Sequence, residues 1–120
     1  MALQEQTFKR DLKYSNWHRP PNLPDYCKAW NIDYVEVRNN KIVAFIEISD
    51  TSYPIEKVDL KFKKGHKFVL SLLTELTKIP SYIVFHNSDL SRFKVFDLQQ
   101  NISVIKSETE YKNWLIKFGT

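Results

Sequence analysis

Residues 31–50, NIDYVEVRNNKIVAFIEISD, constrain the fold of this chain more than any other stretch. Apolar residues alternate with other types along residues 32–37 and again along 42–48, and β-branched and aromatic side chains dominate both runs. Such a pattern is typical of half-buried strands. Asn39 and Asn40 lie between the runs, and asparagine tolerates the positive φ angles that tight turns require. The stretch therefore predicts a β-hairpin.

Two pairing registers of this hairpin place its acidic side chains differently. A two-residue loop sets Asp33 and Glu47 on opposite faces of the sheet, whereas a three-residue loop, 39–41, sets Asp33 directly opposite Glu47. We expect the second register, because it gives one continuous apolar face that ends in the two acids. Facing carboxylates destabilise a sheet, so this register favours a bound cation or a raised pKa. The alternative is that both acids simply end a strand in water.

The acids also carry a resemblance to a known family. Asp33 heads the first strand in IDYVEV, Glu47 lies on the second in AFIEIS, and Trp-His-Arg at residues 17–19 precedes both. This pattern resembles the PD-(D/E)xK nuclease superfamily, and its small phage- and virus-type nuclease-like members in particular, over roughly residues 17–98. The chain departs from the family pattern at Ser49, which replaces the lysine of Glu-x-Lys, and it lacks the proline before Asp33.

The resemblance implies an α/β fold, a three-layer α/β/α sandwich with a mixed central sheet and a restriction-endonuclease-like core. It also implies a metal-dependent DNA endonuclease that hydrolyses phosphodiester bonds, with branched or structured DNA as a candidate substrate. Asp33 and Glu47 would then bind Mg²⁺ or Mn²⁺, which prefer oxygen ligands and can activate a water molecule. The rival interpretation is a nuclease-like fold that lost its lysine and acts as a DNA-binding or protein-interaction module.

A displaced lysine would have to replace the one missing at Ser49. The resemblance places a lysine at the start of the helix that follows the second acidic strand, and Lys67 matches that position. His66 beside it is the reserve candidate. In the predicted first helix, residues 3–14, Glu5 is a further candidate metal ligand, although a solvated glutamate is the more ordinary role for it.

Two basic regions are candidate DNA contacts. The resemblance places His18 and Arg19 beside the active site, where an arginine could bind a phosphate; alternatively, Trp17 anchors this proline-rich loop and both residues face water. A lysine-rich segment follows the hairpin, and with the net charge of +4 it is compatible with a phosphate backbone. Its candidate contacts are Lys57, Lys61, Lys63 and Lys64.

The remaining pattern predicts helices at 3–14, 66–78 and 107–118, and strands at 26–30, 81–86 and 92–98. We expect residues 50–67 to form a flexible loop, because they are polar and contain Pro54. In the second helix, helical spacing predicts the buried face, formed by Val69, Leu72, Leu73 and Leu76. In the third, Ser107 and Glu110 have the spacing of a capping box.

The length and composition limit the number of domains and the kinds of site that this chain can form. With 120 residues, 42% of them hydrophobic, the sequence predicts a single domain, 1–120. One cysteine, Cys27, excludes an internal disulfide and agrees with an intracellular, cytoplasmic setting. Only two glycines are present, which argues against a glycine-rich phosphate loop. We find no apolar run long enough to cross a bilayer. We therefore expect no membrane partner; DNA is the partner that the resemblance implies, and a homodimer is left open.

Overall fold

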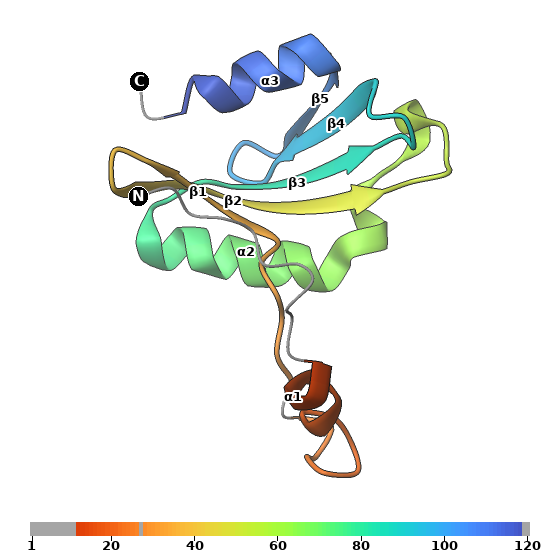
Figure 1. The fold of residues 1–120 in the computed structure, drawn as a ribbon, viewed down its shortest axis with the longest axis vertical. Helices are drawn as coiled ribbons and strands as arrows, with labels where there is room; N and C mark the ends of the chain where they lie inside the picture. The colour runs from red at the N-terminus through yellow and green to blue at the C-terminus, as the bar shows by residue number, and fades with distance from the viewer. Residues whose placement is uncertain (1–11, 27, 119–120) are drawn as a thin grey trace.

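A five-stranded mixed sheet forms the centre of the computed structural model, which describes residues 12–26 and 28–118 of the chain (Figure 1). The sheet order is β1-β2-β3-β4-β5. Strands β2 and β3 are parallel, and the other neighbouring pairs are antiparallel. The chain is thus α/β with a mixed sheet, as predicted. The strands are β1 (Tyr34–Arg38), β2 (Lys41–Asp50), β3 (Ser81–His86), β4 (Arg92–Asp97) and β5 (Ile102–Ser107).

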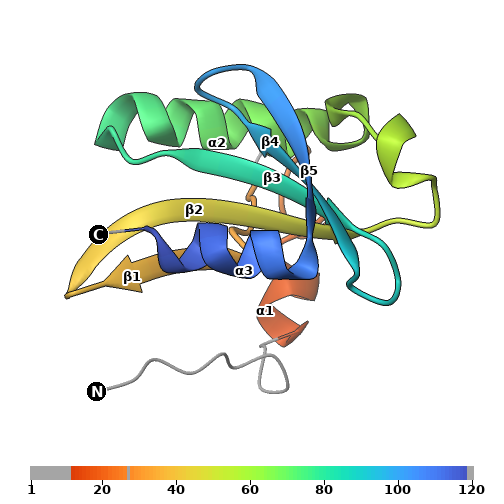
Figure 2. The ribbon, with the colours of Figure 1, turned by 90° about the horizontal axis from the view of Figure 1, so that it is seen from above.

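Helices α2 (Lys64–Thr77) and α3 (Glu108–Ile116) lie on opposite faces of the sheet (Figure 1). Helix α2 connects β2 to β3, because two parallel neighbours require a crossover. Helix α1 (Leu12–Trp17) lies apart from the sheet, on the side of α2. Seen from above, the strands fan from β1 to β5 in the usual twist (Figure 2).

Each face of the sheet has its own apolar core. Phe45 and Ile83 face α2, whereas their neighbours Ile46 and Val84 face α3, since successive side chains of a strand point to opposite faces. Strands β2 and β3 are therefore covered on both sides. This explains the nearly continuous apolar sequence of residues 81–86, and the predicted strand there is confirmed.

The hairpin of β1 and β2 combines the two registers that its sequence allows. At the tip, Asn39 (φ 52°) and Asn40 (φ 64°) form a two-residue turn, and Arg38 pairs with Lys41. A β-bulge, in which Val43 is the extra residue, then shifts the pairing by one, so that Tyr34 pairs with Ile46. The tip thus has the register we did not favour, and the base has the register we expected.

Helix α2 buries a different face from the one its spacing suggested. Leu70 is buried and Leu73 packs on the same core, whereas Leu72 and Leu76 are exposed. The rotation follows from Ser81, which is fully buried and bonds to the α2 side: its Oγ lies 2.6 Å from Oγ1 of Thr74 and donates to the Leu70 carbonyl at 3.1 Å. The predicted apolar face was therefore wrong in part.

Three other expectations need correction or fall outside the described residues. The expected flexible loop at 50–67 contains the 3₁₀ helices η2 (Ile55–Lys57) and η3 (Leu60–Lys63), and it buries Ile55 and Val58. Residues 28–30 form no strand, and strand β5 was not predicted. Most of the predicted first helix lies outside the described residues. By contrast, the capping box of α3, Ser107 with Glu110, is confirmed.

Candidate functional site

Glu47 is the one charged residue that the described core buries, with 4% of its surface exposed. It lies on β2 two residues after Phe45, so its side chain points to the same face as Phe45, beneath α2. A carboxylate in such a place needs partners, since an isolated buried charge is costly.

Two basic side chains approach Glu47 from the junction of η3 and α2. Lys63 Nζ and His66 Nε2 each lie 3.3 Å from Oε2 of Glu47. Lys63 ends η3 and is half-buried. His66 lies four residues before the buried Leu70, so both residues share the face of α2 that packs on the sheet.

Asp33 completes the cluster from the other strand of the hairpin. It directly precedes β1, and the register at the base of the hairpin places it beside Glu47. The Ile48 backbone N–H donates to Oδ2 of Asp33 at 2.9 Å, which fixes the carboxylate at this position. The β-bulge at Val43 thus decides that the two acids meet.

This environment changes the acid–base properties of Glu47. Burial, with the charge and a hydrogen bond of Asp33, raises the pKa of Glu47 to about 7, although Lys63 opposes the shift. No donor among the described residues bonds to its Oε1, which is buried. Burial and the charge of Lys63 lower the pKa of His66. Near neutral pH, Glu47 is therefore partly protonated, and a further cation beside the pair would favour its ionised form.

The two carboxylates fit a magnesium-like ion better than a zinc-like one. Mg²⁺ keeps several waters and is commonly bound through one or two carboxylates. Asp33 and Glu47 offer that number, and the unsatisfied Oε1 of Glu47 provides an oxygen ligand. Within residues 12–26 and 28–118, no group of three or more His, Cys, Asp or Glu side chains is arranged to hold a metal.

The other residues singled out in the sequence lie elsewhere. Lys67 is exposed on α2, one position beyond His66. Near α1, His18 packs on Tyr14 with ring centroids 6.0 Å apart, and Arg19 is exposed. Glu5 and Cys27 lie outside the described residues. Three of the remaining candidate DNA contacts are exposed, namely Lys57, Lys61 and Lys64.

The sequence indicated neither the role of Lys63 nor that of Trp30. The Trp30 ring lies edge-on to His66, with centroids 5.0 Å apart. It also covers Gly65 so closely that a Cβ on Gly65 would lie 2.1 Å from Cη2 of Trp30. A glycine between Lys63 and His66 was the available signal, because it marks a close approach of another group to the backbone.

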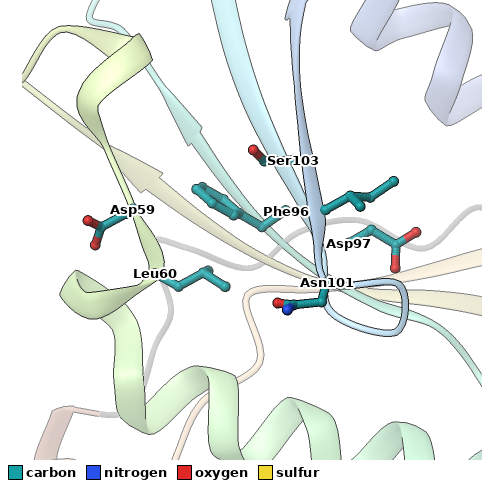
Figure 3. Close-up of a pocket in the computed structure, with 7 residues that line it drawn as sticks. Asp59, Leu60, Phe96, Asp97, Asn101 and Ser103 are labelled. Atoms are coloured by element: carbon teal, nitrogen blue, oxygen red, sulfur yellow. The ribbon is translucent and has the colours of Figure 1, made fainter.

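Two hollows lie elsewhere, and the carboxylates in their linings are already engaged. One, of about 250 Å³, lies between Leu60 and Phe96, with Asp59 and Asp97 on its sides (Figure 3). Asp59 accepts from Lys61 N and Asp97 accepts from the N–H groups of Gln99 and Gln100, so both carboxylates stabilise local turns. The other, of about 310 Å³, lies on the α3 face of the sheet; its lining includes Glu36, which pairs with Arg38.

Comparisons with protein-family models, curated proteins and solved structures returned no match for this chain. The cluster at Glu47 therefore has to be interpreted from its own geometry. Among the described helices, none has the length and apolar character needed to span a membrane.

Proposed function

We propose that this protein is a metal-dependent DNA endonuclease of the PD-(D/E)xK type, with Asp33 and Glu47 as the ligands of Mg²⁺ or Mn²⁺. In this proposal, the sheet with α2 and α3 on its two faces is the three-layer, restriction-endonuclease-like core. The acids lie on a hairpin, and the helix that follows the second acid crosses one face of the sheet. These features support the proposal.

One observation carries it: a buried glutamate, facing a second carboxylate, has an oxygen that no described donor satisfies. Burial and repulsion between the acids both raise its pKa. A divalent cation would relieve both effects, because it bonds the free oxygen and neutralises the pair. Strongly perturbed acids in such pairs are typical of functional sites.

The basic residues have complementary roles in this proposal. The bound ion would supply positive charge and an activated water at the scissile phosphodiester. Lys63 is a cation beside Glu47, and it would stabilise negative charge on the phosphate in place of the lysine missing at Ser49. A lowered pKa keeps the His66 imidazole neutral at pH 7, so it can accept a proton.

The ion pair of Lys63 with Glu47 also favours a second candidate function. Lys63 already neutralises part of the charge of the acid pair without a metal. A nuclease-like fold that binds nucleic acid or protein, with no catalysis, would have the same contact. Metal affinity separates the two candidates.

The test is a titration with Mg²⁺ and Mn²⁺, followed by cleavage assays on linear, branched and single-stranded DNA. We expect saturable binding of one ion and metal-dependent cleavage, and we expect Asp33→Ala and Glu47→Ala to abolish both. Retained nucleic-acid binding in these variants would show that they are folded. If the wild-type chain binds neither ion and cuts none of these substrates, the binding-module alternative replaces the nuclease.

A further inference from the structure

Exposed aromatic residues lie next to both basic residues of the Glu47 cluster, by ring contact with His66 and as the chain neighbour of Lys63. Phe62 directly precedes Lys63, and its ring lies 5.4 Å from that of Tyr53, measured between centroids. Trp30 contacts the other basic residue, His66, through its ring. The exposed fractions are 57% for Tyr53, 47% for Phe62 and 46% for Trp30. Large rings half in water beside a candidate site suggest that a ligand covers them.

Lysines are interleaved with these rings. The segment 53–68 contains five lysines and two acids. Both acids are engaged: Glu56 pairs with Arg92, and Asp59 accepts from Lys61 N while lying 3.9 Å from Lys61 Nζ. Lys61 Nζ also lies 5.7 Å from the centroid of the Phe62 ring. A ligand on this surface would therefore meet cations next to aromatic faces.

We infer that this surface binds single-stranded nucleic acid, whose unpaired bases stack on Tyr53, Phe62 and Trp30 while the lysines contact its phosphates. Rings of this kind recognise unpaired bases, because the faces of paired bases are covered by their neighbours in the duplex. Stacking tolerates any base, so the binding is independent of sequence. The inference rests on the proposed function, since it names the substrate class of the same site.

The experiment is fluorescence anisotropy with labelled oligothymidylate and oligouridylate of about 20 nucleotides, which exceeds the usual site size of a small single-strand binder. A duplex of the same length is the comparison, and EDTA prevents cleavage. We expect the single strands to bind more tightly than the duplex. The ratio of the two single-strand affinities identifies DNA or RNA as the preferred form.

Two variants remove a ring but keep apolar volume, Phe62→Leu and Trp30→Leu. We expect each to weaken single-strand binding by about fivefold or more and to leave duplex binding unchanged. Phe68→Leu is the matched control, because Phe68 is exposed and lies about 200° around α2 from His66. If Trp30→Leu unfolds the protein, Tyr53→Leu replaces it in the test.

Two results would overturn the inference: tighter binding of duplex than of single strands, or equal effects of Phe62→Leu and Phe68→Leu. Neither measurement requires a metal. Single-strand binding without metal-dependent cleavage would therefore refute the nuclease and leave the inference standing. Cleavage of duplex DNA without single-strand binding would support the nuclease and refute the inference.

Discussion

At the scale of single residues, Glu47 is the centre of the proposed site. Its burial is imposed by strand alternation on β2, and its basic partners come from a segment that lies sixteen to nineteen residues further along. A buried acid with one cationic neighbour, Lys63, and one oxygen that no described donor satisfies is costly for stability. Such a cost is typical of positions that serve a function.

The raised pKa of Glu47 predicts how the stability of the metal-free protein depends on pH. The pKa is about 7 in the folded chain against an ordinary value of 4.5, so the folded state binds the proton more tightly. The free energy of unfolding should therefore decrease as the pH rises from 4.5 to 7 and stay level above that. The shift corresponds to about 3 kcal/mol at most.

Glu47→Gln should remove this dependence. Denaturant unfolding at pH 8 in EDTA should show the variant to be more stable than wild type, and at pH 5 the two should differ little. The same pH profile in both proteins would contradict the raised pKa. Added Mg²⁺ should stabilise the wild type at pH 8 and leave the variant unchanged.

Lys63 and Lys67 offer a matched pair of lysines, one on Glu47 and one exposed. Lys63→Met should reduce metal-dependent cleavage by about 10²-fold, the usual effect of removing one stabilising group from an active site. It should also move the pH profile of cleavage upward, because the charge of Lys63 lowers the pKa of Glu47. Lys67→Met should leave both nearly unchanged. A larger loss with Lys67→Met would restore Lys67 as the displaced lysine.

At the scale of elements, helix α2 decides which side chains reach the acids. The stretch from Phe68 to Leu76 contains six apolar residues, both ends included, so more than one face of the helix could pack on the sheet. The bonds between Ser81, Thr74 and the Leu70 carbonyl select the rotation. The same rotation turns His66 toward Glu47 and leaves Lys67 in solvent.

This rotation predicts unequal costs for two leucines of the same helix. Leu70→Ala should lower the free energy of unfolding by about 2–5 kcal/mol, since Leu70 is 3% exposed and the change leaves a cavity. Leu76→Ala should change it by no more than about 0.5 kcal/mol, because Leu76 is 81% exposed. Urea unfolding measures both. A larger cost for Leu76→Ala than for Leu70→Ala would mean that α2 packs by the face that its spacing suggested.

At the scale of the whole molecule, the charge distribution would govern the proposed affinity for nucleic acid. The net charge is +4, and four lysines of the segment after the hairpin are exposed: Lys57, Lys61, Lys64 and Lys67. Contacts between lysines and phosphates release counterions, so affinity decreases as salt is added. In the proposed complex, stacking of bases would contribute the part of the affinity that salt does not change.

The slope of log affinity against log salt should therefore be about −3 for a single strand that meets all four lysines. Lys61→Ala should reduce its magnitude by roughly one contact. Lys112→Ala is the control, because Lys112 is exposed on α3, across the sheet. Anisotropy titrations from low to moderate salt measure the slopes. A slope unchanged by Lys61→Ala would place the nucleic acid elsewhere.

The sequence by itself determined the elements with strong local signals. Alternation of apolar residues predicted both strands of the hairpin, and a nearly continuous apolar run predicted β3. The spacing of Ser107 and Glu110 predicted the start of α3. These features depend on neighbours in the chain, so periodicity and capping were sufficient to predict them. The sequence also predicted that Asp33 lies beside Glu47, as the structure has it, whereas their role as metal ligands stays a prediction.

Only the tertiary structure decided how these parts meet. A bulge at Val43 set the register at the acids, and Ser81 set the rotation of α2. Packing against the sheet ordered residues 50–67, whose polar sequence predicted a flexible loop, and brought Lys63 to Glu47. Each of these outcomes depends on contacts between residues distant in the chain. Local propensity carries no information about such contacts, because the energy that selects them is gained only when the core forms.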